Sequence, residues 1–316
     1  MWETDWTLRE RLRAIVEDHL SGASALTERT AQVLDDAVAC SRAATVEAVR
    51  AEVLDIGAQV IGAHPNMAPL VHVVNAAVRA VAEAATPEDA RLAVRRALER
   101  FRREQQEHVR ALQERVSDLI PDGARVLIHS FSSTVLSALD AARARGRSVS
   151  IVCTESRPLF EGRRTAEHAL ALGLPVTLIV DAAIGEWAGR CTLALVGADC
   201  VSPEGVTNKI GTRLLALAAR EHGIPVYALA ESSKFFPVPL RTARAHSPTE
   251  VWEMPPAGLT IWNEYFETTP LEAFAGICSE SGLLSPEDVR RRIRDLSLDE
   301  RLWARLRSLL SAMNCS

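Results

Sequence analysis

The spacing of the apolar residues changes near Pro121, and this change limits the folds that the chain can adopt. From Leu8 to about Val116, apolar residues recur at spacings of three and four, which is typical of amphipathic helices. From Val126 to Phe236, short Val/Ile/Leu runs alternate with helical stretches, the pattern of parallel βαβ units. The sequence therefore predicts an α/β chain, with an N-terminal helical bundle followed by a doubly wound parallel-sheet (Rossmann-like) domain.

The 316 residues exceed what one hydrophobic core usually organises, so we expect more than one domain. The predicted ranges are a helical domain over residues 1–118, a Rossmann-like domain over 119–297 and a C-terminal helical extension over 298–316. The first range contains five helical patterns, and the tail is typical of a packing or oligomer element.

Composition excludes several classes of function. A formal charge of −5 and a pI near 6.0 argue against non-specific nucleic-acid binding, which needs a basic surface. No apolar run approaches the roughly 18 residues of a membrane span. The cysteines lack C-x-x-C or metal-like spacing, so we expect free thiols, Cys315 among them, and no metal. Free thiols indicate a reducing compartment, so we expect a cytoplasmic location. We expect no cofactor.

Lysine is rare in this chain. Of 36 basic residues only Lys209 and Lys234 are lysine, so the composition favours arginine wherever a generic positive charge suffices. A position that keeps lysine can require a compact ammonium group rather than a planar guanidinium. The alternative is chance survival at two surface positions.

Polar residues follow each apolar run, where the carboxyl ends of parallel strands meet at one edge of the sheet and bind ligands. Hydroxyl residues next to a predicted helix N-terminus could cradle an anion, an arginine could clamp a phosphate, and a carboxylate at a strand tip could act as acid or base. The candidates are Ser130, Ser132, Ser133, Arg157, Asp181, Asp199, Asn208, Lys209 and Lys234.

Each candidate also has a structural interpretation. Ser132 and Ser133 could simply cap the helix that they precede. Arg157 could pair with Glu155, and Asp181 could cap the helix that follows it. Both lysines fall at the same predicted edge, which favours a shared site over chance and suits a polyhydroxylated, phosphorylated ligand.

Several strings together resemble one known family. IHSFSSTVL, TESRPLFEGRRTA, GLPVTLIVDAA, LVGADCVSPEGVTNKIGT and YALAESSKF resemble the family of the initiation factor 2B alpha, beta and delta subunits, methylthioribose-1-phosphate isomerase and ribose-1,5-bisphosphate isomerase. The resemblance spans roughly Leu26 to Val289 and is strongest from Val126 onward. It implies a homodimer or higher assembly, and a phosphorylated sugar as the partner molecule.

The resemblance also implies roles for individual residues. Asp199 would be the acid/base, Asn208 and Lys209 would hold the sugar, and Lys234 would meet a phosphate. The family's catalytic cysteine falls on Ser130, whose hydroxyl does not ionise near neutral pH without an activating base. His129 is adjacent but points to the opposite face of its strand, so it is a poor candidate for that base.

Two further departures lie in the helical half. Where ribose-1,5-bisphosphate isomerases carry an Arg-Gly-Ala phosphate loop and an Ala-Arg-Pro motif, the chain has Ser21-Gly22-Ala23-Ser24 and Ala63-His64-Pro65. Gly22, Ala23, Ser24 and His64 are thus the corresponding substrate-binding candidates. The loss of both arginines weakens the case for a bisphosphate.

Two functions follow from these observations. One is an aldose–ketose isomerase acting on a phosphorylated pentose, with Asp199 and Ser130 as catalytic residues. The other is a non-catalytic protein of the same fold that binds a sugar phosphate or a nucleotide as a regulatory ligand.

Overall fold

A computed structural model describes residues 3–240 and 246–314 of the chain, so Cys315 lies outside the described residues. The chain forms two compact units: one comprises residues up to Glu107 together with those from Leu296 onward, and the other comprises His108–Asp295. The expected boundary at residue 118 differs because α5, a single helix of 33 residues, continues from the first unit into the second. The expected C-terminal extension groups with the N-terminal helices.

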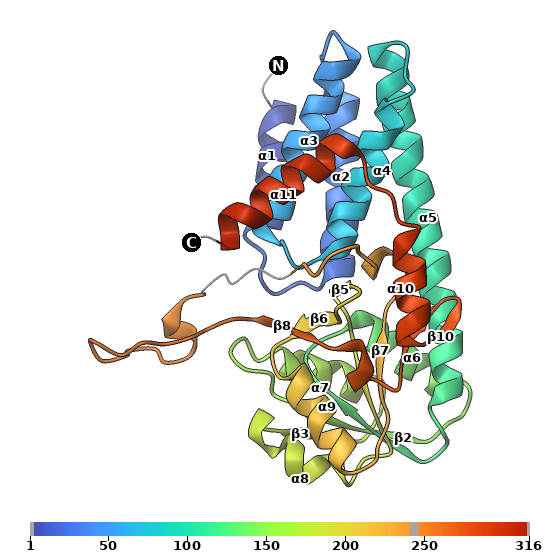
Figure 1. Ribbon diagram of the computed structural model, residues 1–316, viewed down its shortest axis with the longest axis vertical. Coiled ribbons are helices and arrows are strands. Elements are labelled where there is room, and N and C mark those ends of the chain that lie inside the picture. Colours follow the sequence, from blue (N-terminus) through green and yellow to red (C-terminus); the bar gives the residue numbers. More distant parts are fainter. Residues whose placement is uncertain (1–2, 241–245, 315–316) are drawn as a thin grey trace. The chain divides into compact units, whose positions relative to one another are not determined.

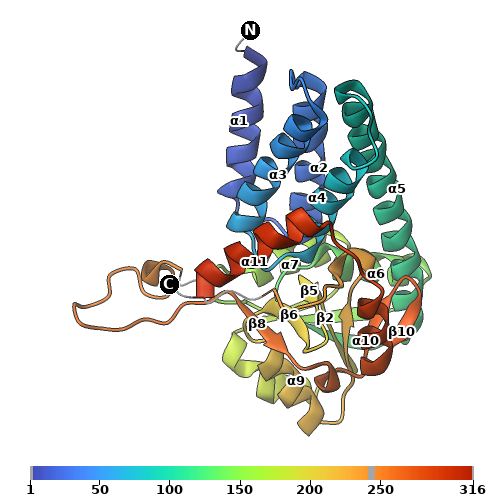
Figure 2. The same ribbon diagram turned by 45° about the horizontal axis from the view of Figure 1, so that its top comes forward.

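The first unit is helical, and the five helices expected from the sequence are present (Figures 1 and 2). Its elements are α1(Glu3–Val16), α2(Ala23–Cys40), α3(Val46–Ala63), α4(Ala68–Val81), the first part of α5(Pro87–Leu119) and α11(Glu300–Asn314).

Helix α4 is the centre of this unit, since ten of its 14 residues are buried and it contacts both α2 and α3. Gly57 of α3 allows the close approach, because a Cβ there would lie 2.5 Å from Cγ1 of Val74. Helix α11 contacts α3, where Arg305 pairs with Asp55 at 2.7 Å. Hydrogen bonding adds a second tie, since the backbone N–H of Asp299 donates to Oδ1 of Asn75 at 2.8 Å.

The second unit is built on a seven-stranded sheet of order β10-β9-β7-β4-β1-β2-β3, parallel except for β10. Its strands are β1(Ala124–Ile128), β2(Val149–Thr154), β3(Val176–Ile179), β4(Leu193–Val196), β7(Val226–Leu229), β9(Gly276–Ser279) and β10(Gly282–Leu284). The predicted doubly wound parallel sheet is confirmed.

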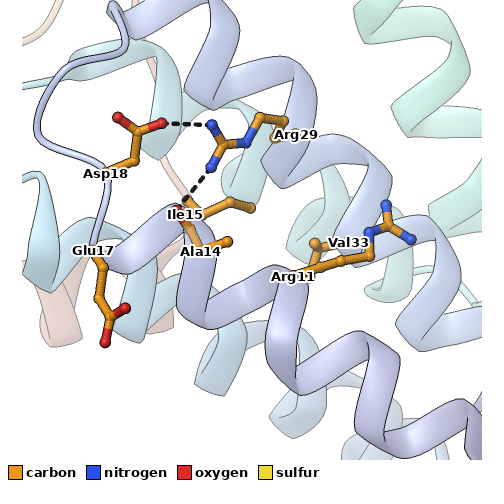
Figure 3. A pocket seen from close by; sticks show the side chains of 7 residues that line it. All are labelled: Arg11, Ala14, Ile15, Glu17, Asp18, Arg29 and Val33. Carbon is orange, nitrogen blue, oxygen red and sulfur yellow. Dashed lines mark hydrogen bonds and ion pairs between the residues drawn. The ribbon is translucent and has the colours of Figure 1, made fainter.

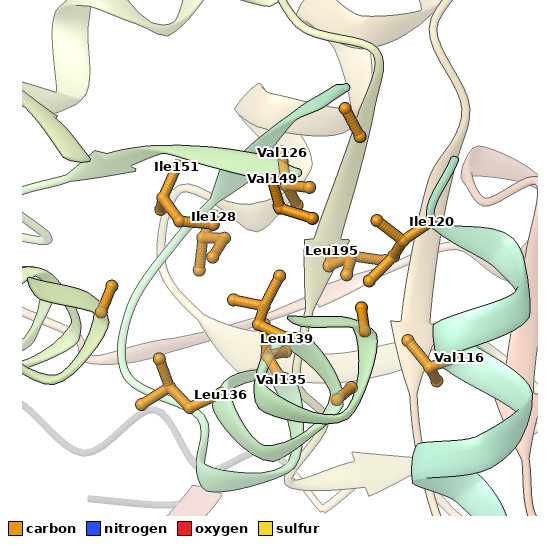
Figure 4. Packing of buried hydrophobic residues seen from close by; sticks show 14 of the residues in the cluster. Val116, Ile120, Val126, Ile128, Val135, Leu136, Leu139, Val149, Ile151 and Leu195 are labelled. Atoms are coloured by element: carbon orange, nitrogen blue, oxygen red, sulfur yellow. The ribbon is translucent and has the colours of Figure 1, made fainter. Parts of the chain in front are cut away.

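Helices cover the sheet. They are α6(Ser133–Ala144), α7(Glu161–Ala171), α8(Ile184–Ala188), α9(Thr212–Glu221) and α10(Pro286–Arg294). Figure 4 shows the core on one face, where Val126 and Ile128 of β1 pack with Leu139 of α6 and Val116 of α5. Helix α9 contacts β4 and contributes no residue to this cluster.

A small antiparallel sheet was not expected from the sequence. It consists of β5(Cys200–Val201), β6(Val206–Lys209) and β8(Phe266–Thr269), in the order β5-β6-β8. Short 3₁₀ turns complete the fold at η1(Asp181–Ala183), η2(Ser232–Lys234), η3(Pro248–Glu250) and η4(Leu271–Ala273). In the described part of the chain, none of the helices has the length and apolarity needed to cross a bilayer.

Truncating the core of the second unit should destabilise it measurably. Leu139 is fully buried against the sheet, so we expect Leu139→Ala to lower the free energy of unfolding by about 2–5 kcal/mol. Leu170, which is 61% exposed on α7, is the matched control, and Leu170→Ala should change that free energy by less than about 0.5 kcal/mol. Urea unfolding followed by circular dichroism measures both. Equal losses for the two variants would contradict this packing.

Candidate functional site

Ser130 and Asp199 lie at the point where the strand order reverses. From β1 the chain adds β2 and β3 on one side, and β4, β7 and β9 extend the sheet on the other. β1 and β4 are neighbours, with Ile128 opposite Leu195, so the residues after both strands meet at the same edge. This switch point is where open α/β sheets bind ligands.

Asp199 carries a carboxylate without a hydrogen bond to any side chain or backbone group that the structure describes. Burial raises its pKa to about 6, although Lys234 and Lys209 lower it and Glu161 and Glu231 act in the same direction as burial. A carboxyl group with such a pKa is present in both protonation states near neutrality. It can therefore donate and accept protons.

Lys209 ends β6 and is only 2% exposed. Its ammonium lies 2.6 Å from Oε1 of Glu161 and 4.9 Å from the centre of the Tyr265 ring. The ion pair and the ring fix the ammonium in place. The neighbouring Asn208 donates from its side-chain amide to Oγ1 of Thr212 at 3.0 Å, which orients it at the start of α9.

Lys234 lies in η2 after β7 and is 4% exposed. Its ammonium has no ion pair or hydrogen bond with the residues described here. A buried ammonium without a partner is costly, because it loses its hydration without compensation. Lys234 is therefore a cation available to an anionic ligand beside Asp199.

A directed chain of hydrogen bonds shapes the loop of Ser130. His129 Nε2 lies 2.6 Å from the carbonyl oxygen of Ile210 and must donate to it, since a carbonyl oxygen only accepts. Burial lowers the pKa of His129, so the neutral ring accepts at Nδ1 from Thr154 Oγ1 at 2.7 Å. The Thr154 hydroxyl oxygen accepts from Ser156 at 2.9 Å, and Ser156 Oγ accepts from the backbone N–H of Ser130 at 2.8 Å.

Because both ring nitrogens of His129 are engaged in these hydrogen bonds, neither is available to activate Ser130, in agreement with the expectation from the sequence. Ser130 itself has a φ of 67°, and its hydroxyl oxygen has no hydrogen-bond partner among the described residues. Gly211 allows the contact with the histidine, since its φ is +104° and a Cβ would lie 2.7 Å from the ring.

Ser132 caps α6, because its Oγ accepts from the backbone N–H of Val135 at 3.3 Å, while Ser133 begins that helix and is exposed. The capping interpretation therefore holds for Ser132. Gly197 allows the close approach of β4, since a Cβ there would lie 2.6 Å from Ser132 Oγ. Anion binding by the two serines stays a prediction.

Arg157 and Asp181 have partners that differ from those we expected. The Arg157 guanidinium donates to the carbonyl oxygens of Glu250 at 3.1 Å and Val251 at 2.8 Å. The Asp181 carboxylate accepts from the backbone N–H groups of Ser156 and Arg157, both at 2.7 Å, instead of capping the helix that follows. Both residues hold the loop after β2, and a phosphate contact of Arg157 stays a prediction.

Gly22, Ala23, Ser24 and His64 belong to the first unit. Gly22 is the N-cap of α2, Ala23 is buried and Ser24 is exposed. The His64 ring is buried, with Nε2 2.7 Å from the Ile15 carbonyl oxygen. The substrate-binding role of these four residues stays a prediction.

The loop before α2 is organised by Asp18, which accepts hydrogen bonds from Ser21 and Leu20. It also accepts one from Arg29 (Figure 3). Burial alone would raise the pKa of Asp18, but these bonds hold it well below its usual range. Asp18 and Arg29 line a cavity of about 550 Å³ together with residues of α1.

Sequence reasoning missed Glu161 and Glu231 as site residues. Glu161 begins α7 and pairs with Lys209, and Glu231 follows β7 and accepts from Ser233 Oγ at 2.7 Å. The signal was present for Glu231, since it ends an apolar strand as Asp199 does. Glu161 gave no such signal, because a glutamate in a first helical turn is common.

Comparison with known proteins gives the family. Residues 19–286 match the sequence model of the initiation factor 2 subunit family. This chain belongs to that family.

Individual relatives carry different names. One relative is a Pyrococcus abyssi protein whose name describes it as translation initiation factor eIF-2B subunit 2-like. It is 37% identical over 60% of this chain and 68% of its own length. A methylthioribose-1-phosphate isomerase of Pelotomaculum thermopropionicum is 36% identical, over 57% of this chain and 56% of that protein. A ribose 1,5-bisphosphate isomerase of Archaeoglobus fulgidus is 36% identical, over 53% and 56%. The matched part thus spans little more than half the length of either isomerase.

Solved structures of the family share the fold. Translation initiation factor eIF-2B of Pyrococcus horikoshii OT3 superposes with a TM-score of 0.77 at 28% identity, over 90% of this chain and 99% of that chain. The 5-methylthioribose 1-phosphate isomerase of the same organism gives a TM-score of 0.70 at 21% identity, over 94% and 87%, which shows the fold alone.

The raised pKa of Asp199 should make stability depend on pH. The folded protein holds this proton up to about pH 6, whereas an unfolded chain releases it near the ordinary aspartate pKa of 3.8. The ionised carboxylate therefore destabilises the fold as pH rises through that window. We expect Asp199→Asn to stabilise the protein more at pH 8 than at pH 4, by on the order of 2–3 kcal/mol. Thermal unfolding of both proteins across this range measures it, and a constant difference would contradict the assignment.

Proposed function

We propose that the chain is an aldose–ketose isomerase acting on a phosphorylated pentose. The observation that carries this proposal is the Asp199 carboxylate, which has a pKa of about 6 and lies under the electrostatic influence of two buried ammonium groups. The unpaired ammonium of Lys234 supports binding of a phosphate, and Asn208 and Lys209 are proposed to hold the sugar.

The reaction sets clear demands on the site. Converting an aldose 1-phosphate into a ketose 1-phosphate moves one hydrogen from C2 to C1 and one proton from the C2 hydroxyl to the ring oxygen. A single carboxyl group with a pKa near neutrality can carry the second transfer, since it accepts at one oxygen and donates at another. Asp199 is proposed for this role, and the ammonium groups stabilise negative charge on the phosphate and on the opened sugar.

The relatives support the substrate class. Two of them are named for isomerisation of ribose 1,5-bisphosphate and methylthioribose 1-phosphate. The strings Ser21-Gly22-Ala23-Ser24 and Ala63-His64-Pro65 lack the arginines of the bisphosphate isomerases' motifs, which favours a ligand with one phosphate over a bisphosphate.

A second function is favoured by Ser130. Its hydroxyl has no hydrogen-bond partner among the described residues, so the carbon-to-carbon hydrogen transfer lacks the ionisable group that a cysteine would supply. A protein that binds a sugar phosphate or a nucleotide without turnover, as a regulatory ligand, would use the same residues. The relatives named after initiation factor eIF-2B are compatible with this role.

Turnover separates the two functions. We expect ketose formation from ribose 1-phosphate, 5-methylthioribose 1-phosphate or ribose 1,5-bisphosphate, followed by NMR. Asp199→Asn should lower the rate about 10²- to 10⁴-fold, and Ser130→Cys should raise it. Asp140→Asn, in the body of α6 where the half-exposed carboxylate pairs with Arg143, is the matched control and should leave the rate unchanged. Tight binding without turnover in the wild type and in Ser130→Cys would favour the regulatory function.

A homo-oligomer, a dimer or higher, is also proposed. Residues 251–262 form an arm that extends away from the sheet in both views (Figures 1 and 2). Its apolar side chains are exposed: Val251 by 41%, Trp252 by 53%, Met254 by 83%, Leu259 by 49% and Trp262 by 64%. Exposed apolar surface of this kind is typical of protein interfaces.

The base of this arm is firmly held. Glu250 accepts from Asn263 at 2.8 Å and from the Tyr265 hydroxyl at 2.5 Å, and Arg157 donates to the carbonyl oxygens of Glu250 and Val251. The arm is thus presented on a fixed support that contacts site residues.

Removing the exposed tryptophans should weaken self-association. We expect the Trp252→Ser, Trp262→Ser double variant to have a lower mass than the wild type in light scattering at micromolar concentration. Leu170→Ser, which removes exposed apolar surface from α7, serves as the control and should keep the wild-type mass. A monomeric wild type would refute the proposed oligomer. An unchanged mass of the double variant would show that the arm is not its interface.

A cytoplasmic location is proposed as well. Cys40 is exposed, Cys153, Cys191, Cys200 and Cys278 are buried, and all five are free thiols. Free thiols persist in reducing compartments.

A further inference from the structure

Two carboxylate oxygens of the second unit are buried without any partner. They are Oε2 of Glu161 and Oε2 of Glu231, whereas Asp199, whose carboxylate also has no hydrogen bond, is only half-buried. Buried polar atoms in folded proteins nearly always have a hydrogen-bond partner, so each exception needs an explanation. The cost is greatest for an ionised group.

The second oxygen of each carboxylate is already engaged, which fixes the position of the free one. Glu161 Oε1 holds the ammonium of Lys209 at 2.6 Å. Glu231 Oε1 accepts from the Ser233 hydroxyl at 2.7 Å, and its backbone carbonyl accepts from the Lys234 N–H at 2.9 Å. The two free oxygens are therefore preorganised acceptors.

Both carboxylates belong to the cluster around Asp199. Each acts electrostatically on the Asp199 carboxyl group, as do Lys209 and Lys234. Each free acceptor therefore lies within electrostatic range of the proposed acid/base, as does the Lys234 ammonium, which has no ion pair or hydrogen bond with the described residues. A ligand that reaches Lys234 with an anionic group lies within the same cluster.

The chemistry of the free atoms selects the ligand group that can satisfy them. A phosphate oxygen carries negative charge and would be repelled, whereas a hydroxyl group can donate a hydrogen bond to a carboxylate. A metal ion is a poor alternative, because the described residues contain no group of three or more potential ligands and two ammonium groups share the cluster.

We propose that Glu161 and Glu231 accept hydrogen bonds from hydroxyl groups of the sugar and so make the site select hydroxylated over deoxygenated sugar phosphates. This inference rests on the proposed binding of a phosphorylated sugar. It adds two specificity-determining residues and assigns to them the hydroxyl groups of the ligand, while Lys234 takes the phosphate.

The ligand-free protein gives a first test. Because Glu231 Oε2 is a buried acceptor without a donor, Glu231→Gln breaks no hydrogen bond at that oxygen and should leave the melting temperature nearly unchanged. Glu280→Gln is the matched control, since both oxygens of Glu280 are engaged by Ser232 and Arg292, and it should lower the melting temperature. A clear loss of stability in Glu231→Gln would show that the oxygen has a structural partner and would overturn the inference.

Ligand binding gives the decisive test. Isothermal titration of ribose 1-phosphate and its 2-deoxy and 3-deoxy forms should show about 10- to 100-fold weaker binding when the contacted hydroxyl is missing. In Glu161→Ala or Glu231→Ala the hydroxylated sugar should bind more weakly, and the difference from its deoxy form should fall to less than about threefold for the hydroxyl that this residue contacts. Glu280→Gln should keep the wild-type selectivity.

The outcomes separate the two levels of the proposal. If the wild type binds the deoxy and hydroxylated sugars equally well, or if both glutamate variants keep full selectivity, the glutamates are not hydroxyl acceptors, while the sugar-phosphate site stands. If the wild type binds none of these phosphorylated sugars, the proposed function falls and this inference falls with it.

Discussion

The second unit depends on the burial of two ammonium groups at one edge of its sheet. Lys209 and Lys234 are 2% and 4% exposed, and each has lost most of its hydration. A folded chain tolerates such groups only with nearby negative charge or with a ligand that supplies it. Glu161 neutralises Lys209 directly at 2.6 Å, whereas Lys234 faces only the diffuse field of the surrounding carboxylates. The site is therefore charged but incompletely paired.

The fold explains how groups so distant in sequence come together. Asp199 follows β4, Lys209 ends a strand of the small antiparallel sheet, and Lys234 follows β7. Each crossover of a parallel sheet returns the chain to the same edge, so residues after successive strands collect there. The hydrogen-bond chain from Ser130 through Ser156 and Thr154 to His129 then ties the loops after β1 and β2 to the segment that follows Lys209.

The sequence predicted the parallel sheet well, because buried parallel strands are continuous Val/Ile/Leu runs that stand out from the helices between them. It also placed Asp199 and Lys234 after apolar runs, and in the structure they follow β4 and β7, whereas Lys209 ends a strand of the small antiparallel sheet. It could not reveal β6, where all four residues are buried although Thr207, Asn208 and Lys209 are polar. Their burial comes from pairing with β8, roughly 60 residues farther along the chain.

Side-chain partners were harder to predict than positions. Arg157 was a reasonable phosphate clamp by its place after β2, but its guanidinium bonds carbonyl oxygens of Glu250 and Val251, more than 90 residues away. No local pattern signals such a contact, because any carbonyl oxygen can accept it. The same holds for Glu161, whose partner Lys209 lies 48 residues away.

The unpaired groups link stability to function. A buried ammonium without a partner at Lys234, a carboxyl group with a raised pKa at Asp199 and free acceptors at Glu161 and Glu231 each weaken the ligand-free fold. A ligand that carries both an anionic group and hydroxyl groups would compensate several of these costs at once. Its binding energy would then stabilise the folded state by mass action, because the unfolded chain offers no comparable set of preorganised partners. The arrangement that makes the empty site costly is thus the one that makes a phosphorylated sugar a favourable occupant.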